Sequence, residues 1–255
     1  MADAKLLAAD EPAPLAFENE AGSSPFFLIC EHASKSIPRQ LGDLGLPAGE
    51  RQRHIAWDIG ALSVARLLAR QLDAPLAYQN YSRLVCDCNR PISAPDFMPT
   101  VSETTAVPGN RDLGAVARRQ RIDEIYRPFH DGVAAVLDDR VAAGLPTVVI
   151  SVHSFTPVFK GVSRPWHCGV LTIADPSYAP RTLELLRRED ALAVGHNEPY
   201  SMSHDSDYTI PVHGEARGLP SVEIEIRQDL IGEDAGQQAW AKRLAAVFST
   251  ALEAL

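Results

Sequence analysis

The chain has 255 residues, 45% of them hydrophobic and 22% charged, a composition typical of a soluble globular protein and not of a disordered chain, a collagen-like rod or a coiled coil. Asp and Glu outnumber Lys and Arg by 33 to 24, and the resulting formal charge of −9 disfavours a nucleic-acid partner. The longest apolar runs have about six residues, against the roughly 20 that span a bilayer, so no membrane segment is expected.

The first 22 residues form an acidic segment that lacks the basic and apolar regions of a secretory signal. Four cysteines are too few for a disulfide framework, which favours a reducing, cytoplasmic location. No linker or repeat divides the rest of the chain. We therefore expect a flexible acidic leader over residues 1–22 and one domain over residues 23–255.

Hydrophobic periodicity predicts strands that alternate with helices along this domain. We expect strands at residues 26–30, 84–88, 147–152, 170–173 and 221–226. We expect a Pro-, Ser- and Thr-rich loop at 91–110 and helices at 58–72, 113–143, 181–194 and 239–255. This order is typical of a single α/β domain with a mixed, mostly parallel sheet flanked by helices.

Histidines follow two of the expected strands directly. His32 comes after the strand at 26–30, and His153 after the strand at 147–152. Polar groups at the carboxyl ends of parallel strands line the ligand crevice of such a sheet. Two neutral imidazoles and a third ligand are the donor set of a catalytic zinc site, which keeps one position open for water. Asp58, which also suits the N-cap of the first helix, is the candidate third ligand, with His54 and Glu31 as alternatives.

Charged residues also occur inside or beside apolar strand patterns. Glu225, in the VEIEIR segment, is either a general base or the partner of Arg227 in a salt bridge on the same strand face. Arg83 and Arg90 flank the strand expected at 84–88. Each of them either binds a substrate carboxylate through two hydrogen bonds or belongs to a surface ion pair. Asn89 would add a neutral donor.

Signatures of other mechanisms are absent from the sequence. It contains no GxSxG, GxxxxGK[ST], GxGxxG or HExxH motif. A cysteine nucleophile at Cys30 stays open, since this residue lies near His32, but its apolar strand favours burial.

Seven motifs occur in order over almost the whole chain after the leader. They are EHASKSIP (31–38), HIAWDIGA (54–61), YSRLVCDCNRP (81–91), VHSFTP (152–157), NEPYS (197–201), DYTIPVHG (207–214) and EIEIRQDLI (223–231). With these motifs the sequence resembles the N-formylglutamate amidohydrolases, a family related more distantly to the zinc carboxypeptidase and aspartoacylase hydrolases. The resemblance implies a phosphorylase/hydrolase-like fold and hydrolysis of a small acidic N-acyl amino acid, N-formyl-L-glutamate above all. It also implies one Zn²⁺ per chain, and we expect a monomer or small homo-oligomer.

The resemblance assigns roles residue by residue. It implies zinc ligation by His32, Asp58 and His153, catalysis by Glu225 and His213, and substrate binding by Arg83, Asn89, Arg90, Ser154, Tyr208 and Arg227. One departure concerns the His-x-x-Glu ligand pair of the carboxypeptidases, because Lys35 stands where that pattern has Glu. Two alternatives therefore remain: another zinc amidase or peptidase, and a metal-free binding protein that kept the pocket.

Overall fold

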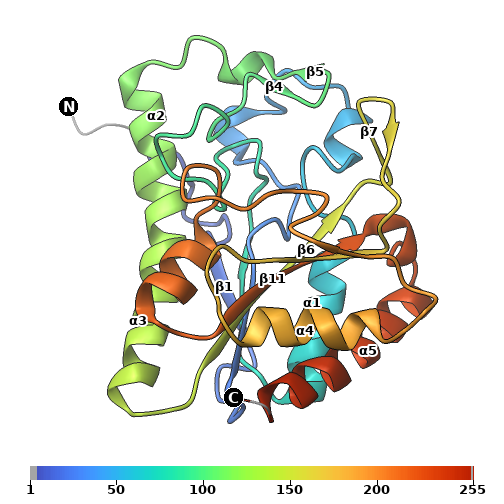
Figure 1. Cartoon of the computed structure of the whole chain (residues 1–255). Coiled ribbons are helices and arrows are strands. Elements are labelled where there is room, and N and C mark those ends of the chain that lie inside the picture. The colour runs from blue at the N-terminus through green and yellow to red at the C-terminus, as the bar shows by residue number, and fades with distance from the viewer. Residues whose placement is uncertain (1–4, 254) are drawn as a thin grey trace.

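A seven-stranded β-sheet forms the centre of the structure, a computed structural model that describes residues 5–253 and 255 (Figure 1). The strands lie in the order β1-β3-β2-β6-β11-β9-β10. Their bounds are Leu15–Glu18 (β1), Phe26–Cys30 (β2), Leu76–Gln79 (β3), Val148–Phe155 (β6), Cys168–Leu171 (β9), Val194–His196 (β10) and Ser221–Arg227 (β11). Two small hairpins lie outside this sheet: β4 (Val101–Ser102) with β5 (Thr105–Ala106), and β7 (Val158–Phe159) with β8 (Val162–Ser163).

The sheet is mixed and mostly parallel, which confirms the predicted fold class. Strands β3, β2, β6 and β11 run parallel to one another, whereas β1 is antiparallel to β3, and β9 is antiparallel to β11. The helices are α1 (Ala61–Leu72), α2 (Ala115–Arg121), α3 (Arg127–Ala142), α4 (Tyr178–Arg187) and α5 (Asp234–Leu252). In the described part of the chain, no helix combines the length and the apolar character that crossing a membrane requires.

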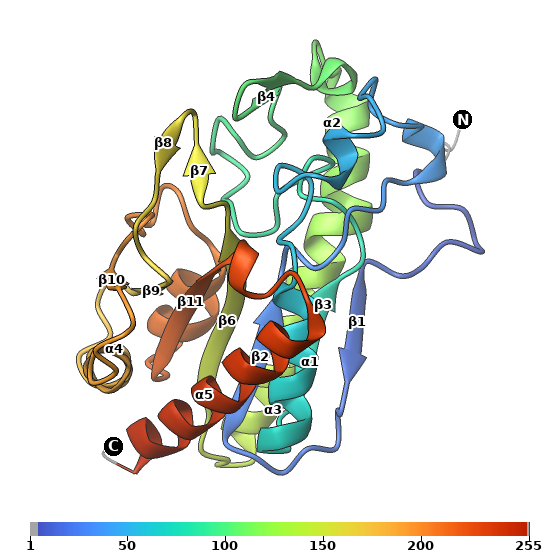
Figure 2. The same ribbon diagram turned by 90° about the vertical axis from the view of Figure 1, so that its right-hand side faces the viewer.

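Alternation along the buried strands divides the core into two parts. In β2, Leu28 and Cys30 pack with α1, α4 and α5, whereas Phe27 and Ile29 pack on the other face with α3. Figure 2 shows α1 and α5 in front of the sheet and α3 behind it. Because the central strands are covered on both faces, nearly every side chain in them is buried.

The strand expected at residues 84–88 is wrong. The strand next to β2 is β3, at Leu76–Gln79, and residues 84–88 form a buried turn instead. Their backbone does not need a ladder partner, because the side chains of Asn110 and Arg121 donate hydrogen bonds to the carbonyl oxygens of the first two residues of the turn. An apolar run therefore marks burial here without marking a strand.

Part of the segment expected as a flexible leader belongs to the sheet. Residues 15–18 form β1, which pairs with β3 along its whole length. Leu6 is buried, and the hydroxyl of Tyr81 donates a hydrogen bond to the carbonyl oxygen of Pro12. Residues 1–4 of the expected leader lie outside the described residues.

Gly60 sets the entry of α1, which begins at Ala61 and not at Asp58 as the sequence suggested. Its φ of +83° lies in the left-handed region, and a Cβ there would meet the carbonyl oxygen of Ile231 at 2.3 Å. The start of α1 therefore packs directly on the chain that follows β11. This close approach holds Asp58, two residues earlier, beside the carboxyl ends of the strands.

We expect Gly60→Ala to lower the free energy of unfolding by about 3 kcal/mol, because left-handed backbone strain and a steric clash add together. Urea unfolding measures the change. Gly144→Ala is the matched control: its φ is +66°, but nothing lies within 4 Å of an added Cβ. It should cost about 1 kcal/mol. Equal losses in the two variants would contradict the role assigned to the contact with Ile231.

Candidate active site

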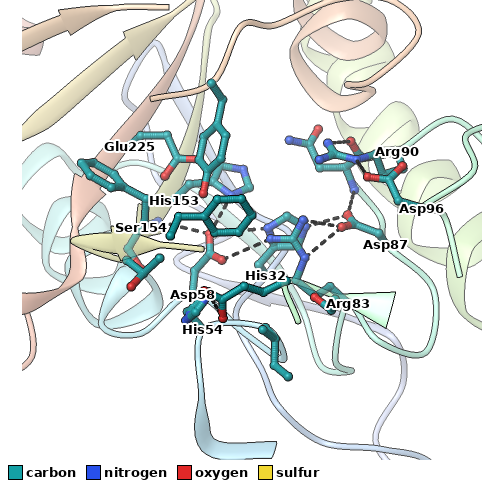
Figure 3. Close-up of a pocket in the computed structure, with 18 of the residues that line it drawn as sticks. His32, His54, Asp58, Arg83, Asp87, Arg90, Asp96, His153, Ser154 and Glu225 are labelled. Atoms are coloured by element: carbon teal, nitrogen blue, oxygen red, sulfur yellow. Dashed lines mark hydrogen bonds and ion pairs between the residues drawn. The ribbon is translucent and has the colours of Figure 1, made fainter. Parts of the chain in front are cut away.

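A cavity of about 480 Å³ opens at the carboxyl ends of β2, β6 and β11 (Figure 3). Eight of the residues expected in the site line it: His32, Asp58, Arg83, Asn89, Arg90, His153, Ser154 and Glu225. Its rim includes Val101, Ser102 and Phe159 from the two hairpins. In both overall views these hairpins lie at the same end of the molecule.

Strand register places the central polar groups side by side. In the parallel pair of β11 and β6, Glu225 is opposite His153, and Glu223 is opposite Ser151. The intervening residues, such as Ile224, point into the other half of the core. The polar face of each strand is therefore turned toward α3 and the cavity, as the two-residue period of a strand requires.

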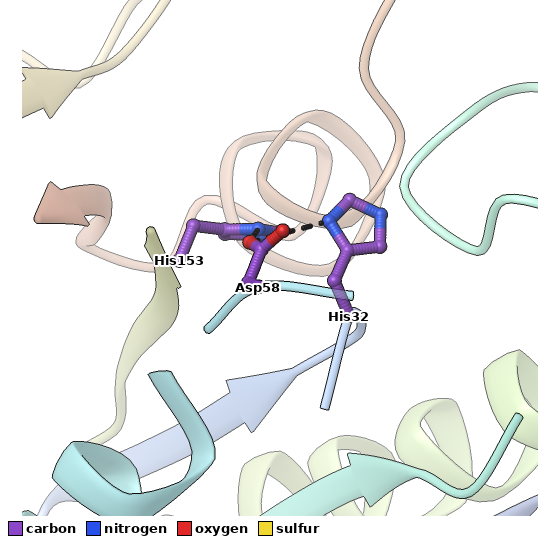
Figure 4. Close-up of side chains that lie close together, drawn as sticks. All are labelled: His32, Asp58 and His153. Carbon is purple, nitrogen blue, oxygen red and sulfur yellow. Dashed lines mark hydrogen bonds and ion pairs between the residues drawn. The ribbon is translucent and has the colours of Figure 1, made fainter. Parts of the chain in front are cut away.

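The ligand atoms of His32, Asp58 and His153 all lie within 4.8 Å of one another (Figure 4). Oδ2 of Asp58 is 2.8 Å from Nδ1 of His153 and 3.4 Å from Nδ1 of His32. The backbone N–H of Ser154 donates to the same oxygen at 3.1 Å. All three side chains are buried. Burial alone would raise the pKa of Asp58, but the two histidines hold it below its ordinary value.

The other ring nitrogens of both histidines face carboxylates. Nε2 of His32 lies 2.7 Å from Oδ1 of Asp87, and Nε2 of His153 lies 3.1 Å from Oε2 of Glu31. This leaves the Nδ1 atoms directed at Asp58, and Nδ1 of His32 is buried without a hydrogen-bond partner among the described residues. Metal-binding histidines typically donate their second N–H to a carboxylate in this way. The donor set therefore fits a metal ion.

Neither alternative third ligand lies in this group of three. Glu31 contacts the outer nitrogen of His153 and accepts hydrogen bonds from the hydroxyl of Ser151. His54 lies 3.5 Å from Glu103, nearer the rim. Asp58 is thus the carboxylate that the fold places between the two histidines.

Negative charge exceeds positive charge around these residues. Burial raises the pKa of Glu225 well above its ordinary value and that of Glu223 to about 7. Burial by itself would lower the pKa of His153, but Glu223 and Glu31 hold it well above the usual range. The raised pKa values of two glutamates and of a histidine beside them indicate an excess of negative charge, which suits a cation.

Arg83 supplies positive charge beside this group. Its guanidinium is 2.5 Å from Oδ2 of Asp87 and 3.6 Å from Oδ1 of Asp58. Arg90 lies farther along the cavity, where it contacts Asp96 at 3.0 Å and Asp207 at 3.4 Å (Figure 3). Each arginine thus has protein partners, and each also faces the cavity.

Asn89 connects three parts of the site. Its Oδ1 accepts hydrogen bonds from the backbone N–H groups of Tyr208 and Thr209, and its Nδ2 donates to Glu223 at 3.0 Å. The side chain is buried. Asn89 therefore ties the turn before it to β11 and to the segment at 208–209.

Three of the expected site residues do not line the cavity. His213 lies behind it in a π-helical turn (Ile210–Gly214), with Nε2 3.0 Å from Nδ1 of His130, and burial lowers its pKa to about 4. The ring of Tyr208 packs against the ring of His130. Arg227 pairs with Asp229 near the surface.

The structure also brings in residues that the sequence reasoning missed. Asp87 holds His32, whereas Glu31, expected only as an alternative metal ligand, lies against His153. Asp87 is a charge inside an apolar run, the same signal that drew attention to Glu225, and could have been found in that way. Tyr200 also lines the cavity; the resemblance implies a substrate-side loop at its NEPYS motif but gives Tyr200 itself no role.

The model of the N-formylglutamate amidohydrolase family matches residues 24–232 of this chain. The crystal structure of a gene product from Agrobacterium tumefaciens is similar over 98% of both chains, with 41% sequence identity and a TM-score of 0.95. That of N-formylglutamate amidohydrolase from Ralstonia eutropha covers 95% of this chain and 98% of its own, with 20% identity and a TM-score of 0.68, a likeness of fold. Comparison with curated proteins gives no match.

We expect Asn89→Ala to lower the free energy of unfolding by about 3 kcal/mol, because one buried and one partly buried N–H group and the buried Glu223 would each lose a hydrogen bond. Urea unfolding measures the loss. Asn80→Ala is the control, since its side chain makes one exposed hydrogen bond, to the carbonyl oxygen of Ala13. It should cost about 1 kcal/mol or less. A similar small loss for Asn89→Ala would argue against its connecting role.

Proposed function

The chain belongs to the N-formylglutamate amidohydrolase family, and we propose that it hydrolyses the amide bond of an N-acyl amino acid, with N-formyl-L-glutamate as the substrate and formate and L-glutamate as products. One observation carries the proposal: a buried group of two histidines and an aspartate lies beside a protonatable glutamate in an open cavity. Amide hydrolysis needs an activated water and a group that moves a proton, and this arrangement suits both.

We propose that His32, Asp58 and His153 hold one zinc ion per chain. Two imidazoles and a carboxylate are a donor set of catalytic zinc sites. When bound, the ion would act as a Lewis acid and lower the pKa of a bound water toward about 7. Asp87 and Glu31 would orient the two imidazoles, since each lies within 3.1 Å of the ring nitrogen that faces away from Asp58.

Glu225 is the proposed general base. Strand register puts it next to His153, and its Oε2 is buried without a hydrogen-bond partner among the described residues. Its carboxylate takes a proton from the water that attacks the acyl carbon and then gives that proton to the departing amine nitrogen. A raised pKa suits both steps, because the group then holds the proton long enough to return it.

Arg83 and Arg90 are the proposed contacts for the substrate carboxylates, with Asn89 and Ser154 beside them in the cavity lining. Both guanidinium groups are partly exposed, with 25% and 19% of their side-chain surface accessible, and both carry positive charge into an acidic protein. For Tyr208, His213 and Arg227, which lie outside the lining, we propose a supporting role.

The purified protein should contain about one zinc per chain, and His153→Ala should lose most of it, because two ligands hold the ion far more weakly than three. Elemental analysis of protein purified without chelator measures the content. His196→Ala, at an exposed position in β10, is the control and should retain the metal. Full retention in His153→Ala would remove this residue from the ligand set, and metal-free wild type would favour a binding protein.

Glu225→Gln should keep its metal and lower kcat by at least about 100-fold, the usual value of a positioned general base. Gln preserves the shape of the side chain and cannot accept the proton. The assay follows release of the free amine from N-formyl-L-glutamate. Unchanged turnover would move the role of base to another acid, and Glu223→Gln is the variant to compare, because Glu223 lies two residues away on the same strand face.

A further inference from the structure

Tyr200 forms part of the cavity wall that faces the buried histidines. It lines the cavity together with Phe155 and Phe159, and 37% of the residue surface is exposed. Glu225 and Arg83 line the same cavity, and the charges of both act on the Tyr200 hydroxyl. Tyr200 and the proposed base therefore border the same cavity.

Arg164 holds this hydroxyl. Its Nη1 donates a hydrogen bond to Oη of Tyr200 at 2.9 Å. The guanidinium carbon lies 4.7 Å from the centre of the Tyr200 ring and 4.6 Å from that of Phe159. No carboxylate of the described residues pairs with Arg164, so its charge is stabilised by aromatic faces and by the hydroxyl oxygen.

The Tyr200 hydroxyl is neutral, and its O–H group is available to donate a hydrogen bond. One lone pair accepts from Arg164, and its own O–H has no acceptor among the described residues. Burial and the negative charge of Glu225 raise the pKa of Tyr200 to about 12, so the proton is present at neutral pH. A cation bonded to the oxygen polarises the O–H bond and strengthens its donation.

The position suits charge that develops during the reaction. When water adds to the acyl carbon, the carbonyl oxygen of the substrate becomes an oxyanion, which a neutral hydroxyl donor in the same cavity can stabilise. His213, the donor suggested by the sequence, lies behind the cavity in contact with His130.

We propose that Tyr200 is a catalytic residue that donates a hydrogen bond to the carbonyl oxygen of the substrate as its negative charge develops. Arg164 is a positioning residue that holds the Tyr200 hydroxyl and polarises it. The proposal rests on the proposed amide hydrolysis and adds a donor contributed by the chain itself.

Tyr200→Phe should lower kcat for N-formyl-L-glutamate by about 100-fold, the usual effect of removing one oxyanion donor, with KM changed by less than about threefold. Arg164→Gln should lower kcat by about tenfold, because the hydroxyl remains but is neither held nor polarised. The double variant should be no slower than Tyr200→Phe alone, since Arg164 acts through Tyr200. Additive losses would mean that Arg164 acts by itself.

Tyr78→Phe and Arg66→Gln are matched controls. Arg66 donates to the hydroxyl of Tyr78 at 3.3 Å and stacks on its ring at 5.2 Å, as Arg164 does with Tyr200, but neither residue lines the cavity. Both variants should keep the wild-type kcat. A loss similar to that of Tyr200→Phe would show that the effect of deleting such a pair is structural.

Binding of N-phosphono-L-glutamate, in which an anionic tetrahedral phosphoryl group replaces the planar formyl group, separates this proposal from the proposed function. Calorimetric titration of the metal-containing protein should show binding about 100-fold weaker for Tyr200→Phe than for wild type. Equal affinities would overturn the role of Tyr200, whatever the turnover. Tyr200-dependent binding by a wild type that does not hydrolyse N-formyl-L-glutamate would support the donor and refute the substrate. A wild type that does not bind the probe would refute both.

Discussion

The buried negative charge at the carboxyl ends of β2, β6 and β11 is the constraint on which the rest of the site depends. Carboxylates withdrawn from water are costly unless each one is paired. Asp58 is shared by two histidines, and Asp87 is shared by His32 and Arg83. Even so, Glu225 keeps an oxygen without a partner among the described residues. This carboxyl group lies next to a donor set that fits a metal, and its free oxygen can accept and return a proton.

Pairing of these charges also explains the shape of the chain around the cavity. The buried turn at residues 84–88 brings Asp87 to His32. Side-chain hydrogen-bond donors, and not a neighbouring strand, pair with the backbone carbonyl groups of this turn. Asn89 then connects the turn to β11 through Glu223. Segments far apart in the sequence are thus fastened to one another by polar groups that are themselves part of the site. The same hydrogen bonds and ion pairs therefore make the site rigid and satisfy its buried polar atoms.

The part of the cavity wall at Tyr200 is stabilised in a different way. Arg164 lies between aromatic rings and meets no carboxylate of the described residues. Its positive charge is stabilised by the quadrupoles of the aromatic rings and by the oxygen of Tyr200, and it acts on the cavity through that hydroxyl. The cavity therefore has an acidic, metal-binding side and a side with a polarised hydroxyl. A substrate that gains negative charge during the reaction would lie between them.

The sequence by itself determined the strands at 26–30 and 221–227 to within a residue, the first from a continuous apolar run and the second from an alternation of apolar and charged residues. It also singled out His32, Asp58, His153 and Glu225, since charges beside such runs are rare without a role. Only the tertiary structure decided that β3 and not the run at 84–88 lies next to β2, because burial in a turn and burial in a strand produce the same apolar pattern. It also decided that His213 lies behind the cavity and Tyr200 inside it, because the direction of a loop side chain depends on packing between distant segments and not on local periodicity.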